Sequence, residues 1–347
     1  MKKITTATLA ILAAAFLSSC AGIRYMDIET REPAQVTLPL AVRKVLIVNN
    51  VPQQPDDMGH FLQKVGRVAS NNVKASSDSI AIFYTEALSQ FLAEEEYFDD
   101  VLYSHEQLRR DNNVLLEQPL LPEVMIEMRK ESGADAIISL DKMVMRTNRT
   151  DHFYQEGYVY SGMTAKIESV MRVYLPTIDG QIPAVQLNDS LYWQGYDIQD
   201  GRAYADEVLP TREDAMKELA VYAADKMAKV FAPHWEFQNR WVYTFMSSQM
   251  READTYAKNH QWQEAINIWE PVYNKEKNKA NKAKTAHNIA LAYEMMDDMT
   301  AALQWAHTAM ELTTKYAASD SLDLRRCVIY VRELERRADA SNKLDMQ

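Results

Sequence analysis

The spacing of apolar residues predicts an alternation of strands and helices over the first two thirds of the chain. Residues 42–48 are apolar and β-branched, which is typical of a buried strand. Residues 76–95 carry apolar side chains three and four positions apart behind Ser77 or Asp78 as a cap, which predicts an amphipathic helix. In chain order the further elements expected are a strand over 98–103, a helix over 122–131 ended by Gly133, a strand over 134–145, strands over 163–175 and 185–198, and a helix over 212–231.

The two strands over 163–175 and 185–198 are expected to form an antiparallel hairpin. Pro176, the pair Asp179-Gly180 and Pro183 lie between them and favour a turn. In the first strand, apolar positions such as Ile167 alternate with charged ones such as Lys166, so one face of the sheet should be in contact with water. The helix over 212–231 would cover the other face. We therefore expect an α/β sandwich with a mixed sheet over residues 42–232.

From residue 233 onward the pattern favours helices to the end of the chain. A lead-in helix is expected over 235–249 and a closing helix over 322–338. Between them, a set of small and aromatic residues recurs with a shift of 37 positions. Its members are Ala253, Tyr256, Trp262, Ala265, Trp269 and Val272, followed by Ala290, Tyr293, Met299, Ala302, Ala306 and Ala309. Small residues at matched positions allow two antiparallel helices to approach closely.

This register resembles the tetratricopeptide repeat, over residues 246–313. Two departures are that the glycine of the family's first helix is Ala here and that its turn glycine is replaced by His260 and Asp297. The resemblance implies stacked helical hairpins with a concave groove for an envelope protein or peptide. Side chains outside the packing register would line that groove, and the candidates are Gln249, Glu252, Thr255, Asn259, Asn288, Leu291 and Glu294. The fold class expected for the chain is α+β, with an all-α repeat domain over 233–347.

The N-terminal residues are typical of an export signal. Lys2 and Lys3 precede a short apolar run, and residues 1–19 would form the signal peptide. The segment Leu17-Ser18-Ser19-Cys20 resembles the lipobox of bacterial lipoproteins, in which the cysteine carries a diacylglycerol with acyl chains such as palmitate. The lipid would be the only contact with the membrane. Residues 20–41, with Pro33 and Pro39, are expected to be the anchor and a linker.

By resemblance to known sorting signals, the residues after Cys20 favour the outer membrane, facing the periplasm, because Ala21 and Gly22 are not aspartate and no acidic run follows. The stretch from 42 to 175, with a strand that opens on Gly-Ala-Asp-Ala-Ile-Ile, is weakly similar to the periplasmic α/β domains of curli-secretion lipoproteins, penicillin-binding-protein activators and the Tol-system propeller protein. The two antiparallel strands that follow depart from that pattern.

Composition narrows the classes of function. The formal charge is −11, and it becomes −13 once Lys2 and Lys3 are removed, so nucleic acid is not an expected partner. Nine glycines include no phosphate-binding motif, and seven histidines include no metal-binding pair. The acidic runs lie at expected helix ends or turns, where water solvates them. Cys327 fits a buried apolar position. We expect no cofactor, no metal and no catalysis.

Aromatic residues give the alternative to a protein scaffold. They concentrate in and beside the expected hairpin, at Tyr154, Tyr158, Tyr160, Tyr174, Tyr192, Trp193 and Tyr196. Such a stripe on one strand face is able to stack on a sugar or a peptide, although ordinary strand composition also accounts for it. The main hypothesis is therefore a non-enzymatic envelope lipoprotein that binds proteins through its repeats. The alternative is a cell-wall or glycan recognition module that uses the hairpin around 154–196.

Overall fold

The computed structural model describes residues 22–347 except 66–67, 154–158, 177–183 and 198–206. The expected signal peptide and Cys20 therefore lie outside the described residues. The chain divides into two compact units, one formed by residues 34–234 and the other by residues 235–346 together with the stretch that ends at Pro33. A mixed sheet with helices makes up the first unit, and most of the second is helical. The expected α+β class is confirmed.

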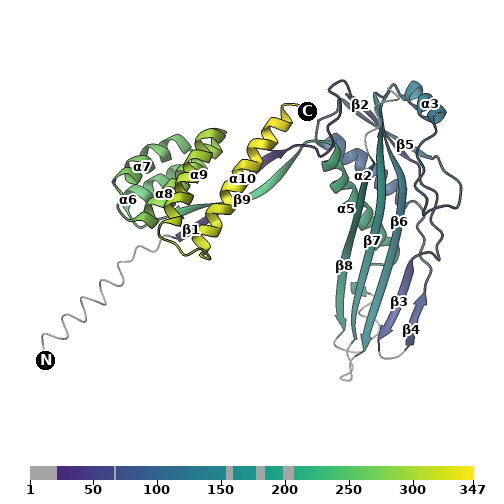
Figure 1. Ribbon diagram of the computed structural model, residues 1–347. Coiled ribbons are helices and arrows are strands. Elements are labelled where there is room, and N and C mark those ends of the chain that lie inside the picture. Colours follow the sequence, from purple (N-terminus) through teal and green to yellow (C-terminus); the bar gives the residue numbers. More distant parts are fainter. Residues whose placement is uncertain (1–21, 66–67, 154–158, 177–183, 198–206) are drawn as a thin grey trace, which may run out of the picture. The chain divides into compact units, whose positions relative to one another are not determined.

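A seven-stranded sheet forms the first unit, and its longest strand organises the others (Figure 1). In chain order the strands are β2 (Lys44–Asn49), β3 (His60–Val65), β4 (Val68–Asn72), β5 (Asp100–Gln107), β6 (Ala136–Phe153), β7 (Val159–Tyr174) and β8 (Val185–Asp197). Along one edge of β6, the parallel strands β2 and β3 pair with its beginning and its end in turn. Along the other edge, β7 pairs antiparallel over nearly the full length. The sheet therefore forks, with β5 beyond β2 and β4 beyond β3.

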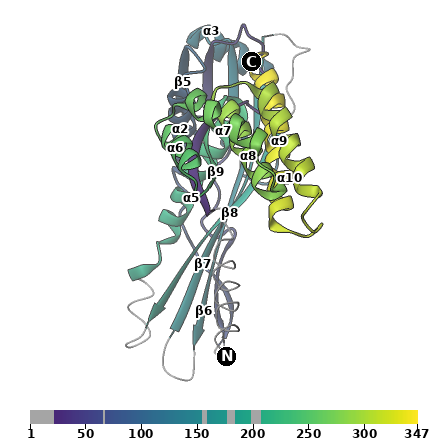
Figure 2. The ribbon, with the colours of Figure 1, turned by 90° about the vertical axis from the view of Figure 1, so that its left-hand side faces the viewer.

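Helices cover both faces of the sheet only at the end where β2 and β5 lie. The helices α2 (Ile80–Glu94) and α5 (Arg212–Phe231) pack on one face and bury the largest apolar core. On the opposite face, α3 (Pro122–Ser132) and nearby loop residues cover a smaller apolar cluster around Leu46, Ile137 and Tyr174. Figures 1 and 2 show that β6, β7 and β8 continue well past α3. Beyond α3 this second face is open.

Most elements of this unit agree with the hydrophobic pattern. The helix over 212–231 is confirmed at both ends, and its cap residue Thr211 accepts a hydrogen bond from the backbone N–H of Asp214. Gly133 ends α3 with a φ of 66°, as expected of a C-terminal glycine cap. The hairpin of β7 and β8 is confirmed. The cap of α2 was predicted wrongly, because Ser79 precedes that helix and the hydroxyl of Ser77 donates to the carbonyl oxygen of Gln54 instead.

The second unit contains five helices in the described residues and a two-stranded ribbon. The helices α6 (Ser248–Lys258), α7 (Trp262–Lys275), α8 (Lys279–Met295), α9 (Met299–Thr314) and α10 (Leu322–Leu344) follow one another in order (Figures 1 and 2). The ribbon pairs β1 (Gly22–Glu32) with β9 (His234–Thr244). Two predictions are therefore wrong: residues 22–32 are a strand and not part of a linker, and no helix covers 235–244. Aromatic residues occupy every second position of Trp235-Glu236-Phe237 and of Trp241-Val242-Tyr243, which is the period of a strand.

The recurring small residues lie in the interior of this unit. The side chains of Ala253, Ala265, Trp269, Ala290, Ala302, Ala306 and Ala309 are at most 2% exposed, and Trp262 is 6% exposed. Tyr256, Val272, Tyr293 and Met299 are half-buried and pack against the same core. Cys327 is buried next to Thr313. The positions predicted to allow close approach of the helices are thus buried in the core of this unit.

Candidate functional site

The chain's own ribbon contacts part of the helical surface on which a partner was expected. The side-chain amide of Asn288 on α8 accepts from the backbone N–H of Tyr243 and donates to its carbonyl oxygen, both at 2.8 Å. Near the ends of the ribbon, Arg24 contacts Asp254 on α6 at 2.7 Å and Glu32 pairs with Arg336 on α10. The helices hold β9 as a groove would hold an extended peptide.

A buried ion cluster attaches the ribbon to two helices. The carboxylate of Glu294 is 1% exposed and lies 3.0 Å from the Nε of Arg240 on β9. It also accepts from the hydroxyl of Tyr330 at 2.7 Å and from Arg337 on α10 at 2.6 Å. A buried carboxylate requires such partners, because an unpaired charge away from water is strongly unfavourable.

These contacts correct part of the predicted groove. Asn288, Leu291 and Glu294 are fully buried, so they are not available to a partner. Helix periodicity could not show this. The segment that contacts Asn288 and Glu294 is the strand β9, and the sequence pattern had assigned that segment to a helix. The candidates on α6, namely Gln249, Glu252, Thr255 and Asn259, are exposed.

The open face of the sheet presents a continuous set of side chains from four strands. Residues that pair across β3, β6, β7 and β8 form rows, and alternate residues of a strand lie on the same face. One row is Phe61, Asn148, Thr164 and Tyr192, and the next is Gln63, Thr150, Gly162 and Gln194. The flanking rows are His152, Tyr160 and Tyr196 at one end and Arg146, Lys166 and Ser190 at the other.

One end of this face carries an exposed aromatic cluster. The rings of Tyr160 and Tyr196 are 5.0 Å apart, and the ring of His152 lies 5.9 Å from that of Tyr160. The hydroxyl groups of Tyr160 and Tyr192 are 2.5 Å apart, and this hydrogen bond raises the pKa of Tyr160. Tyr192 lies over Gly162, where a Cβ would be 2.6 Å from its hydroxyl oxygen. With Tyr192 55% exposed and Tyr196 59% exposed, the cluster offers ring faces to a ligand.

Other aromatic residues predicted for this stripe are placed differently. Tyr174 is 4% exposed, and its hydroxyl donates to Asp141 at 2.7 Å. Trp193 points to the opposite face, where it packs against the main core. Tyr154 and Tyr158 lie outside the described residues. The usable cluster is thus Tyr160, Tyr192 and Tyr196 with His152.

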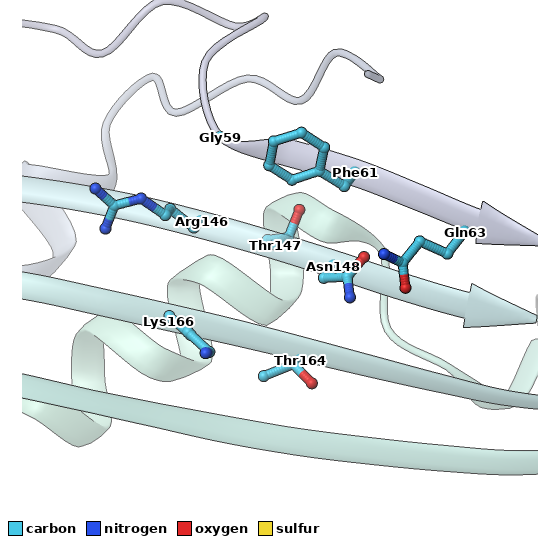
Figure 3. Close-up of a pocket in the computed structure, with 8 residues that line it drawn as sticks. All are labelled: Gly59, Phe61, Gln63, Arg146, Thr147, Asn148, Thr164 and Lys166. Carbon is cyan, nitrogen blue, oxygen red and sulfur yellow. The ribbon is translucent and has the colours of Figure 1, made fainter. Parts of the chain in front are cut away.

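A groove of about 390 Å³ continues from the aromatic cluster. Its walls are formed by Gly59, Phe61, Gln63, Arg146, Thr147, Asn148, Thr164 and Lys166 (Figure 3). Figure 3 shows the amides of Gln63 and Asn148 side by side on neighbouring strands, with Arg146 and Lys166 further along the sheet. Only Lys166 was indicated beforehand, by its place on the wet face of the hairpin. Gly59, Phe61 and Gln63 lie on or directly before β3, a short strand of mixed character that periodicity did not detect. Arg146, Thr147 and Asn148 lie on β6 beyond residue 145, where the predicted strand ended.

Some charged groups in and beside the groove have ion-pair partners within the protein, and one does not. Glu168 contacts Lys142 at 2.5 Å and Arg146 at 3.7 Å, and the hydrogen bond from Lys142 lowers the pKa of Glu168. The exposed ammonium of Lys166 forms no ion pair with any residue that the structure describes. The Oδ1 atom of Asn148 is buried and accepts no hydrogen bond. The exposed ammonium of Lys166 is thus available to a ligand, whereas the Oδ1 atom of Asn148 lies below the surface of the groove.

One buried carboxylate of the sheet unit is fully engaged by its own neighbours. The buried carboxylate of Asp141 accepts from Asn50, Ser139, Arg172 and Tyr174, which uses its acceptor positions in holding the fold. Within the described ranges, no three His, Cys, Asp or Glu side chains come together in a way that could hold a metal ion. Among the same residues, no helix has the length and apolar character needed to span a bilayer.

Comparison with family models assigns the chain to a family. A model described as a domain of unknown function (DUF8603) matches residues 42–243, more than half of the chain. The chain belongs to the DUF8603 family. This DUF8603 match covers the sheet unit and β9, and a second model, a domain of unknown function (DUF6340), matches residues 251–336 in the helices.

No curated protein matches this DUF8603 chain. Among solved structures, the PelC dodecamer from Paraburkholderia phytofirmans matches with a TM-score of 0.23 and 9% identity, over 61% of this chain and 100% of that one. A putative neuraminyllactose-binding hemagglutinin homolog from Helicobacter pylori matches with a TM-score of 0.26 and 11% identity, over 57% of this chain and 86% of that one. Similarities of this size say nothing about the function of the DUF8603 chain.

Proposed function

We propose that this DUF8603 protein is a non-enzymatic lipoprotein of the bacterial envelope that binds a glycan through the open face of its sheet. The observation that supports glycan binding is the continuous surface of exposed tyrosine rings, amides and cations on β3, β6, β7 and β8. Flat rings stack on the apolar faces of sugar rings, while amide and charged groups bond to the hydroxyls around them. Both kinds of group lie on the same face of the sheet, with the amides and cations in the walls of the groove and the tyrosine rings beside it.

Attachment to the envelope is part of the same proposal. It is supported by the signal-like N-terminus and the Leu17-Ser18-Ser19-Cys20 segment. A diacylglycerol on Cys20 would hold the protein at the outer membrane, facing the periplasm. Replacing Cys20 by Ala should release the protein from the membrane fraction into the soluble fraction, as measured by immunoblotting after cell fractionation. Equal retention of the variant in the membrane would argue against the lipid anchor.

For the helical unit we propose the role of a tetratricopeptide-like scaffold that supports its own ribbon. The buried alanines at recurring positions favour this kinship. A groove that binds an envelope protein is now the weaker hypothesis, because β9 contacts Asn288 and Glu294 and three of the seven expected contact residues are buried. The exposed α6 residues alone offer a small, polar surface.

The test of glycan binding uses the full chain without its signal peptide. Binding is measured by sedimentation with isolated peptidoglycan and by affinity electrophoresis in gels that contain soluble polysaccharides. The double variant Tyr192→Ala/Tyr196→Ala should lose at least tenfold in affinity. Tyr25→Ala is the matched control, since its ring is 57% exposed but lies in the other unit. If the native chain binds none of these glycans, or if the double variant binds as well as the control, the proposal is wrong.

A further inference from the structure

Beyond glycan binding itself, we infer that the groove selects acidic glycans and holds a carboxylate of the sugar chain with Lys166 and Arg146. This inference rests on the proposed function and adds the class of ligand. The two side chains lie on neighbouring strands in direct register, two residues along each strand from the row of Asn148 and Thr164. Both side chains line the groove (Figure 3).

The charge of the groove contrasts with that of the protein. The whole chain has a formal charge of −11, yet the open face of β6 and β7 carries Lys142, Arg146 and Lys166 against Glu168 alone. Glu168 is engaged by Lys142 at 2.5 Å, whereas its separation from Arg146 is 3.7 Å. Arg146 is 44% exposed in its side chain and retains donors for another partner. A neutral ligand would form no ion pair with this excess of positive charge.

Hydrogen-bonding groups beside the cations suit a sugar more than a free ion. The hydroxyl of Thr164 both donates and accepts, and the side-chain amide of Gln63 does the same. An inorganic anion other than a protonated phosphate offers no donor to these groups. A sugar ring that carries a hydroxyl next to a carboxylate can bond to Thr164 and to Lys166 together.

The spacing along the sheet accommodates a short oligosaccharide. Six residues of β7 separate Tyr160 in the aromatic cluster from Lys166, which corresponds to about 20 Å at ~3.4 Å per residue. This length leaves room for several linked sugars between the stacked rings and the cations. Stacking at one end and charge at the other would then bind different sugars of the same chain.

The experiment compares polysaccharides that differ only in charge. Polygalacturonate and alginate are each used as the free acid and after methyl esterification, and affinity for the full chain without its signal peptide is measured by calorimetry. The native protein should bind the acids at least tenfold more tightly than the esters. Lys166→Gln should reduce this preference to about twofold or less. Lys130→Gln, an exposed lysine on α3, is the matched control and should change neither affinity.

The outcomes separate the inference from the function on which it rests. Equal affinity for acid and ester, or a preference that survives in Lys166→Gln and in Arg146→Gln, overturns the acidic-glycan inference while glycan binding stands. Binding of neutral glycans alone does the same. Failure to bind any polysaccharide, in these titrations and in the sedimentation assay, overturns both. Because Lys166 contacts no other described residue through an ion pair, its variant is expected to fold, and circular dichroism verifies this.

Discussion

The buried histidine of the helical unit should make the stability of this unit depend on pH. His287 is 2% exposed, and its ring stacks on that of Trp241 at 4.8 Å with Tyr243 and Tyr330 beside it. Its Nε2 lies 3.0 Å from the carbonyl oxygen of Trp241 and must donate to it. Burial lowers the pKa of His287 from 6.5 to about 4, although the carbonyl and the carboxylate of Glu294 act in the opposite direction and Arg240 assists burial.

The sign and size of the effect follow from the difference between the folded and the unfolded pKa. Between pH 6.5 and about 4, the unfolded chain binds the proton while the folded chain does not. The stabilising contribution is therefore complete above pH 6.5 and is lost as the pH falls toward 4. A difference of 2.5 units corresponds to about 3 kcal/mol in full, of which about 2 kcal/mol is lost between pH 7.5 and pH 5.

Urea denaturation followed by tryptophan fluorescence measures this effect in the right unit, since five of the six tryptophans lie in residues 235–305 and only Trp193 lies in the sheet unit. His287→Gln retains a donor for the carbonyl oxygen of Trp241 but does not titrate. The native chain should lose about 2 kcal/mol more than this variant between pH 7.5 and pH 5. Equal losses in the two proteins would refute the argument from burial.

Three further substitutions test other parts of the structure. Glu294→Ala should lower the free energy of unfolding of the helical unit by about 3–5 kcal/mol, because Arg240 loses its buried partner, whereas the exposed Glu335→Ala should change it by less than about 0.5 kcal/mol in the same urea assay. Asn288→Ala leaves the N–H and carbonyl of Tyr243 without partners and should cost about 1–3 kcal/mol, while Asn259→Ala, on the exposed end of α6, should be nearly neutral; similar values for the two would mean that the ribbon is not held as described. Gly162→Ala should weaken glycan binding as much as Tyr192→Ala does, because the new Cβ would lie 2.6 Å from the tyrosine hydroxyl, and binding at the native level would contradict the described position of that ring.

Local periodicity was sufficient wherever an element buries one face against its own neighbours. The helix over 212–231 and the hairpin of β7 and β8 were predicted for this reason, as was the burial of alanines such as Ala265 and Ala290. Those positions follow from the side chains of one segment and from the period of a helix or a strand. The wet face that includes Lys166 was visible in the same way.

Pairings between distant segments were decided only by the tertiary structure. The alternation of aromatic residues over 235–243 is a strand signal, but the sequence contains no sign that β1, more than 200 positions earlier, supplies the partner or that Asn288 binds the strand. The groove likewise needs β3 beside β6, a pairing between residues more than 80 positions apart. By itself the sequence determined which faces are apolar, because that is a local property of side chains. Which faces are covered and which are left open to a ligand depends on long-range packing, which no local period records.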